Sequence, residues 1–235
     1  MLAIFKREMR SYFTGVIGYV FLVLFLAVAG VVFAFTTLYA MTADVTSYFT
    51  FMLMFSAIIL PILTMKSFSE ERKTKTEQLI LTAPVSLTSM VLGKFLASYA
   101  MFAGATVFTS LYFLVLIPYA PIKVATLIGN VIALLLVGMV FIAIGLFVSS
   151  LTENQLSAAV GTIAIIFALL GVGLLSTLLP SNYFLRYVFD ALSVFSRFSS
   201  FTNGYFDLAS LVYYLSVAAV FLYLTIRVYD RRRYN

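Results

Sequence analysis

The sequence predicts an all-α, polytopic integral membrane protein with six transmembrane helices. Of its 235 residues, 63% are hydrophobic and 10% are charged, whereas soluble domains carry roughly a quarter charged residues. The mean hydropathy is +1.09. Six apolar runs divide the chain, and a helix needs about 20 such residues to cross a bilayer. A soluble globule could not bury this much apolar surface, so lipid must be the solvent.

The predicted spans follow the apolar runs, and residues 1–235 form one predicted transmembrane domain. The runs occupy residues 16–40, 48–65, 88–117, 125–149, 156–179 and 209–229. The second is close to the lower limit of about 17 residues, and the third is long enough to tilt. Glycines within spans, such as Gly138 with Gly145, are expected to permit close helix packing.

Before the first span, residues 1–14 predict an amphipathic helix. One face is apolar and consists of Leu2, Phe5, Met9, Tyr12 and Phe13. The adjoining face is basic and consists of Lys6, Arg7 and Arg10. This pattern suits a helix in the cytoplasmic membrane interface. The alternative is a frayed basic N-terminus that only sets topology. No cleavable signal peptide is expected, because the first apolar run is too long for one.

Lysine and arginine residues set the predicted orientation. Eleven of the 15 lie before the first span, between the second and third spans, or after the sixth. Six spans place these segments on one side of the membrane and leave Lys123, Arg186 and Arg197 on the other. Because cytoplasmic loops are enriched in such residues, both termini are predicted to be cytoplasmic, with the chain in the cell membrane. The same distribution argues against a nucleic-acid partner.

Composition excludes several kinds of chemistry. The chain has no cysteine and no histidine, which removes thiolate nucleophiles, most zinc sites and imidazole bases. No charge is expected to be buried in the spans, so an ion-coupling relay is not expected. Lys94, early in the third span, is expected to snorkel to the cytoplasmic surface. Gly93-Lys94 is not a phosphate-binding loop, because Thr88 and Phe95 break the motif. No catalytic residue, metal or cofactor is therefore expected on this chain.

The cytoplasmic loop 66–87 carries the clearest functional signal. Ser67 with Glu70 makes a plausible capping box. Glu71 with Lys75, and Lys73 with Glu77, have the i,i+4 spacing of ion pairs on an exposed helix. An apolar tip then follows at Leu79-Ile80-Leu81, Pro84 stops the helix and Ser86 can cap the third span. The loop is either a stiff lever against a soluble partner or a solvated linker with self-paired charges.

At this point the sequence resembles a family, the ABC type-2 permeases, and within it most closely the gliding-motility subgroup. The resemblance starts from Glu71-Arg72-Lys73, Thr76-Glu77, Leu79-Ile80-Leu81-Thr82, Pro84-Val85-Ser86 and Gly93-Lys94. Further matches are Ser149-Ser150-Leu151-Thr152-Glu153-Asn154-Gln155 with Ala158-Ala159, and Phe201-Thr202-Asn203-Gly204 with Asp207-Leu208 and Tyr213-Tyr214-Leu215-Ser216. One departure is Lys75, at a position where the family often has Gly.

The resemblance implies a membrane subunit of an ATP-driven transporter. Its partners would be a second permease copy or relative and separate ATPase subunits, which would carry the ATP and Mg. The ATPase-coupling residues would be Glu70, Glu71, Arg72, Lys73, Glu77, Leu79, Ile80, Leu81 and Pro84. A secondary cytoplasmic contact would be formed by Glu153, Asn154 and Gln155. The N-terminal helix would support the coupling helix.

The outward segment 180–208 has an apolar pattern of its own. Its apolar positions are Leu185, Val188, Phe189, Leu192, Phe195 and Phe198, interrupted by Arg186, Asp190 and Arg197. In related permeases this region forms short re-entrant helices or a surface for an extracytoplasmic partner; the alternative is an amphipathic loop on the outer membrane surface. Asn203-Gly204 predicts a turn, and Asp207 predicts the N-cap of the last span.

Two other functions stay open beside ATP-driven export. The chain could act alone as a secondary carrier or channel. It could also belong to an ATPase-driven bundle that moves or organises an extracytoplasmic partner without transporting a solute. Neither the substrate nor the choice between homodimer and heterodimer follows from the sequence.

Overall fold

The described part of the chain contains six long apolar helices, and this confirms the predicted fold class. The computed structural model describes residues 1–42, 44–77, 86–116, 123–178, 193–202 and 207–234, and this part of the chain contains no strand. Helices long and apolar enough to span a membrane cover Val16–Tyr39, Val45–Lys73, Leu87–Leu116, Val124–Leu151, Gln155–Gly173 and Leu208–Arg233. The predicted runs lie within a few residues of these bounds, with one exception. The observed second span begins three residues before the predicted run 48–65 and continues into the predicted loop 66–87.

The described part of the chain contains nine α-helices and two short helical extensions. The α-helices are α1 (Leu2–Thr14), α2 (Val16–Phe33), α3 (Val45–Thr64), α4 (Lys66–Lys73), α6 (Leu87–Ser110), α7 (Val124–Leu151), α8 (Gln155–Leu178), α10 (Val194–Thr202) and α11 (Leu208–Tyr234). A π-helical turn, η1 (Ala34–Tyr39), extends α2, and a 3-10 turn, η2 (Leu111–Leu116), extends α6. The N-terminal helix is therefore present as predicted; its place in the membrane interface stays a prediction.

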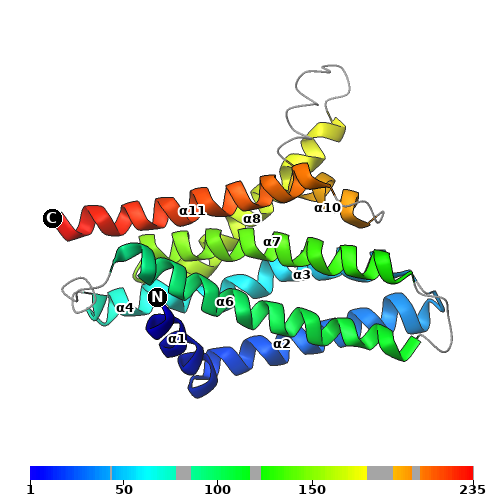
Figure 1. Ribbon diagram of the computed structural model, residues 1–235, viewed down its shortest axis with the longest axis horizontal. Helices are drawn as coiled ribbons and strands as arrows, with labels where there is room; N and C mark the ends of the chain where they lie inside the picture. Colours follow the sequence, from blue (N-terminus) through cyan, green and yellow to red (C-terminus); the bar gives the residue numbers. More distant parts are fainter. Residues whose placement is uncertain (43, 78–85, 117–122, 179–192, 203–206, 235) are drawn as a thin grey trace.

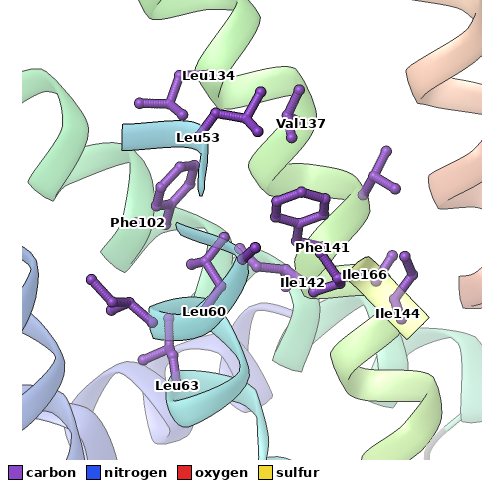
Figure 2. Packing of buried hydrophobic residues seen from close by; sticks show 14 of the residues in the cluster. Leu53, Leu60, Leu63, Phe102, Leu134, Val137, Phe141, Ile142, Ile144 and Ile166 are labelled. Atoms are coloured by element: carbon purple, nitrogen blue, oxygen red, sulfur yellow. The ribbon is translucent and has the colours of Figure 1, made fainter. Parts of the chain in front are cut away.

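Helix α7 lies at the centre of the bundle. It is the most buried of the six described spans, and it contacts α3, α4, α6, α8, α10 and α11. Figure 2 shows the core between these helices, with Leu53 and Leu60 of α3 and Phe102 of α6 around Val137 and Phe141 of α7. Since lipid is as apolar as these side chains, close packing rather than the hydrophobic effect holds such helices together.

Two glycines of α7 allow this close packing, as predicted. A Cβ atom on Gly138 would lie 2.0 Å from the ring of Phe102 on α6, and one on Gly145 would lie 2.1 Å from Thr64 Oγ1 on α3. Both distances are far below van der Waals contact, so neither position accepts a side chain unless Phe102 or Thr64 is displaced.

One end of the bundle carries both termini and α4. Figure 1 shows the N-terminus, the C-terminus and α4 together at the left, with η1 and η2 toward the opposite end. Ser86 caps α6 by accepting a hydrogen bond from Ser89 N, as predicted. Asp207 likewise accepts from Ala209 N and Ser210 N at the start of α11. The shared end agrees with an even number of spans.

Candidate coupling site at the α4 end of the bundle

Helix α4 follows α3 through a joint at Met65, which separates the two helices in the backbone. Ser149, near the end of α7, closes this joint from outside. Its Oγ accepts from Phe68 N and from Ser69 N, both at 3.1 Å, and donates to Met65 O at 3.0 Å. The amides in the first turn of a helix lack backbone acceptors within that helix. The buried hydroxyl of Ser149 on α7 therefore serves as an acceptor for the start of α4.

The predicted capping box of this loop is wrong. Ser67 lies inside α4 rather than before it, and its buried Oγ has no hydrogen-bond partner. Glu70 instead pairs with Lys66, at 3.1 Å. The reason is that α4 starts directly after α3 at Met65, so there is no extended residue at Ser67 to serve as an N-cap.

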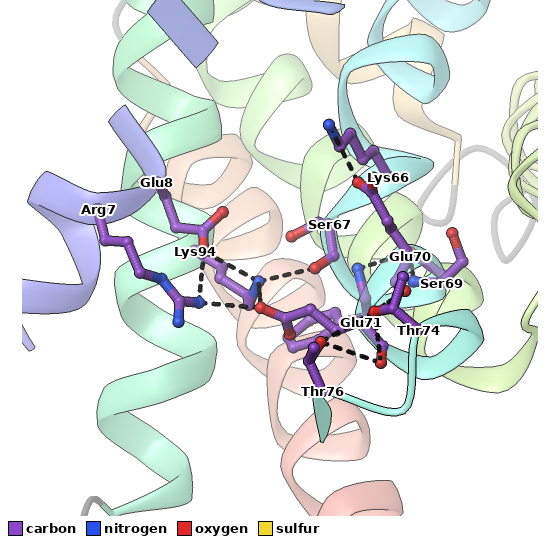
Figure 3. A network of polar contacts seen from close by, with 12 residues as sticks. Arg7, Glu8, Lys66, Ser67, Ser69, Glu70, Glu71, Thr74, Thr76 and Lys94 are labelled. Atoms are coloured by element: carbon purple, nitrogen blue, oxygen red, sulfur yellow. Dashed lines mark hydrogen bonds and ion pairs between the residues drawn. The ribbon is translucent and has the colours of Figure 1, made fainter. Parts of the chain in front are cut away.

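A cluster of four charged side chains joins α1, α4 and α6 (Figure 3). Lys94 of α6 lies 3.1 Å from Glu8 of α1 and 2.9 Å from Glu71 of α4. Its Nζ also donates to Ser67 O, at 2.7 Å. Arg7 bonds to the same two carboxylates, at 2.8 and 2.9 Å. Two cations thus share two anions between three helices.

The expectation that Lys94 snorkels to the surface is wrong, and so is the expectation that the spans bury no charge. The Lys94 side chain is only 1% exposed. It stays inside because Glu8 and Glu71 neutralise it there, and because the ring of Phe68 lies 5.0 Å from its Nζ. A buried ammonium is stable only with such partners.

Glu8 shows the electrostatic effect of the cluster. Burial by itself would raise its pKa, but Lys94 and Arg7 favour the ionised form through charge and hydrogen bonds. The result is that the pKa of Glu8 lies below its ordinary value of 4.5. The carboxylate is therefore ionised at neutral pH, as the cluster requires.

The predicted ion pairs between Glu71 and Lys75, and between Lys73 and Glu77, do not form, because α4 ends at Lys73. Lys75 then has φ 58°, in the left-handed region that Gly adopts most easily. A lysine thus adopts at this position a backbone conformation that usually favours glycine. Glu77 instead pairs with Arg232 of α11, at 3.1 Å, and Arg232 also donates to Ser150 O at 2.6 Å.

The structure brings the two predicted cytoplasmic contact regions together. Arg72 of α4 pairs with Glu153 at 3.0 Å and donates to Leu151 O at 2.8 Å. An open hollow of about 620 Å³ lies beside this pair and is lined by Met65, Lys73, Glu153, Asn154, Gln155 and Leu156. Asn154 also accepts from Leu156 N at the start of α8. The hollow gives α4 and the α7–α8 turn one continuous surface.

Some predicted site residues lie outside the described part of the chain. These are Leu79, Ile80, Leu81 and Pro84 at the tip of the loop, and Leu185, Arg186, Val188, Phe189, Asp190 and Leu192 of the outward segment. Of that segment, α10 is described. Its Phe198 is buried against the bundle, and the guanidinium of Arg197 stacks 4.5 Å over the ring of Tyr213. The re-entrant interpretation stays a prediction.

Comparison with known proteins agrees with this arrangement. A family model described as "ABC-2 family transporter protein" matches residues 33–229 of the 235. The chain belongs to the ABC-2 transporter family. No curated protein matches it. This ABC-2 protein is thus a multi-pass transmembrane component of an ABC transporter, and membership of the family implies an ATPase partner.

Three residues of the site were not predicted from the sequence of this ABC-2 protein. Glu8 was left out of the basic N-terminal face, Ser149 appeared only as part of a matching stretch, and Arg232 only as a topology signal. A lone acid among three bases at positions 6–10 was a signal that could have pointed to a charged partner elsewhere. For Ser149 no local signal exists, because its partners lie some 80 residues away in sequence.

Proposed function

We propose that this chain is the permease subunit of an ABC exporter and is moved by separate ATPase subunits that bind at α4. The observation that carries the proposal is the bonding of α4. Its ion pairs and hydrogen bonds reach α1, α6 and α7, and the turn after it is bonded to α11. A displacement of the α4 region would therefore act on several spans together, as a switch driven from another subunit requires.

The energy for transport would come from the partner. The sequence of this chain offers no phosphate-binding loop, so ATP and Mg are assigned to the ATPase subunits, and a second permease copy or a relative would complete the membrane part. The basic residues support a place in the cell membrane with both termini cytoplasmic. The three matching stretches support the gliding-motility subgroup.

The decisive experiment replaces residues 70–82 by a flexible Gly/Ser linker of equal length. Membrane insertion should persist, and stimulation of the co-expressed ATPase by the permease should be lost. The matched control replaces the outward residues 41–44 in the same way and should retain stimulation. Unchanged stimulation in the 70–82 variant would remove the coupling assignment.

A point variant tests the docking surface with less disturbance. Lys73 is exposed on α4 beside the hollow, so Lys73→Glu should lower ATPase stimulation without lowering the melting temperature. Lys6→Glu, an equal charge change on α1, is the control. A complex that hydrolyses ATP in response to a partner protein but moves no solute would favour the mechanical role over export.

A further inference from the structure

A second, polar pocket lies beside α4 and shares no lining residue with the hollow described above. It has a volume of about 350 Å³, which is within the size range of small-ligand sites, roughly 300–1,000 Å³. It is formed where α1 meets the ends of three spans. Gly15 and Ile17 mark the start of α2, Lys66 follows the end of α3, and Lys94 belongs to the start of α6. A pocket bounded by span ends and an amphipathic helix lies at the depth of lipid headgroups.

The charges in this pocket are balanced. Its lining holds three cations and three anions, namely Arg7, Lys66, Lys94, Glu8, Glu70 and Glu71. The pocket therefore offers no net attraction to a simple anion or cation. It suits a ligand that carries both signs a few ångströms apart.

Several groups in the lining keep unused hydrogen-bonding capacity. Ser67 is more than nine-tenths buried, and its hydroxyl has no partner. Arg7 uses Nη2 for both of its ion pairs, so its other N–H groups are left for a ligand. Glu70 pairs with Lys66 through Oε2, which leaves Oε1 as an acceptor. A buried polar group without a partner is costly, so a missing ligand is its simplest explanation.

We propose that this pocket binds the headgroup of a zwitterionic phospholipid that carries a primary ammonium, the phosphatidylethanolamine class. The phosphate lies against Arg7, whose fork of donors matches phosphate oxygens, and accepts from the unpaired hydroxyl of Ser67. The ammonium donates to Glu70 and to the hydroxyls of Thr74 and Thr76, which also line the pocket. The acyl chains extend from the pocket beside Ile17 and lie along α2.

This assignment distinguishes the proposed ligand from close alternatives. A choline headgroup has no N–H donor, so it cannot use the acceptors around Glu70. An anionic lipid such as phosphatidylglycerol adds negative charge to a lining that is already neutral. Soluble glycerophosphoethanolamine has the same phosphodiester and ammonium but lacks the acyl chains that hold the lipid at the membrane surface.

The test is native mass spectrometry of the purified full chain in detergent, with phosphatidylethanolamine, phosphatidylcholine and phosphatidylglycerol of identical acyl chains added at equal concentration. The ethanolamine lipid should give the most retained complex. Glu70→Gln should reduce that complex about tenfold, the loss expected for a charge-assisted hydrogen bond. The matched control is Glu153→Gln, which also removes one exposed, paired carboxylate but lines the other hollow.

Three outcomes would overturn the proposal. Equal binding of the three lipids would show that the pocket does not discriminate between headgroups. Equal loss in both variants would show an effect unrelated to this pocket. Displacement of the lipid by soluble glycerophosphoethanolamine at equal concentration would assign the pocket to a soluble ligand. Melting temperatures without added lipid verify that both variants are folded. The measurement needs no ATPase, so its failure leaves the coupling proposal untouched.

Discussion

At the scale of single residues, Ser149 holds the joint between α3 and α4 together. Replacing it by alanine leaves two amides and one carbonyl of that joint without this partner. Because an unpaired buried polar group costs about 1–3 kcal/mol, we expect Ser149→Ala to lower the free energy of unfolding by about 3 kcal/mol. Thermal unfolding of the purified protein measures this.

The neighbouring serine is the control for that variant. Ser150 Oγ donates to Phe147 O within its own helix, and alanine there leaves only a carbonyl that already accepts a backbone bond. Ser150→Ala should therefore cost well under half as much. Equal losses in the two variants would contradict the role given to Ser149.

Lys94 is the second residue with a large expected effect. Lys94→Gln removes the buried cation from Glu8 and Glu71, although Arg7 keeps part of the compensation. Removing one partner of a buried ion pair costs about 3 kcal/mol or more. We expect a clear fall in melting temperature, whereas Lys6→Gln on the exposed face of α1 should change it little.

Glu8 makes stability depend on pH. Its pKa is lowered in the folded state relative to the ordinary value of 4.5, so its contribution is complete above pH 4.5 and is lost as the pH falls through the lowered folded-state pKa. Melting temperature should drop in this acidic window. In Glu8→Gln the drop should be smaller; an unchanged pH profile would show that the cluster does not control it.

At the scale of helices, glycine positions decide how closely the spans approach. Gly138→Ala would force a methyl group into the ring of Phe102, and overpacking of this kind costs about 1–3 kcal/mol. Gly30→Ala provides the opposite case, because nothing lies within 4 Å of the added atom. There the better helix propensity of alanine should leave stability unchanged or raise it. Melting temperatures of the pair test the packing of α6 against α7.

The helices themselves could be predicted from the sequence because their causes are local. Apolar runs set the spans, and Ser86 and Asp207 cap helices that start next to them. The coupling site could be predicted only in outline. Where α4 ends is decided at Lys73 and Lys75, but which side chains meet Glu71 or Glu77 is decided by helices more than 20 residues away. Spacing along one helix therefore predicted the wrong partners.

At the scale of the whole molecule, orientation is open to a direct test. The chain contains no cysteine, so a single introduced thiol can be labelled without background. Thr42 and Thr76 are exposed at opposite ends of the second span. On intact cells, a membrane-impermeant maleimide should label Thr42→Cys and should label Thr76→Cys only after permeabilisation. The reverse pattern would overturn the cytoplasmic placement of the termini.

The joint closed by Ser149 has a mechanical consequence for the bundle. Helix α4 is bonded to α7 at two levels, through the amides of Phe68 and Ser69 to Ser149 and through Arg72 to Leu151 O. A load applied at the α4 end of the bundle would thus reach α7, whose 28 residues extend over about 42 Å at 1.5 Å per residue. Because α7 touches α3, α6, α8 and α11, a displacement of α7 would act on four other helices at once.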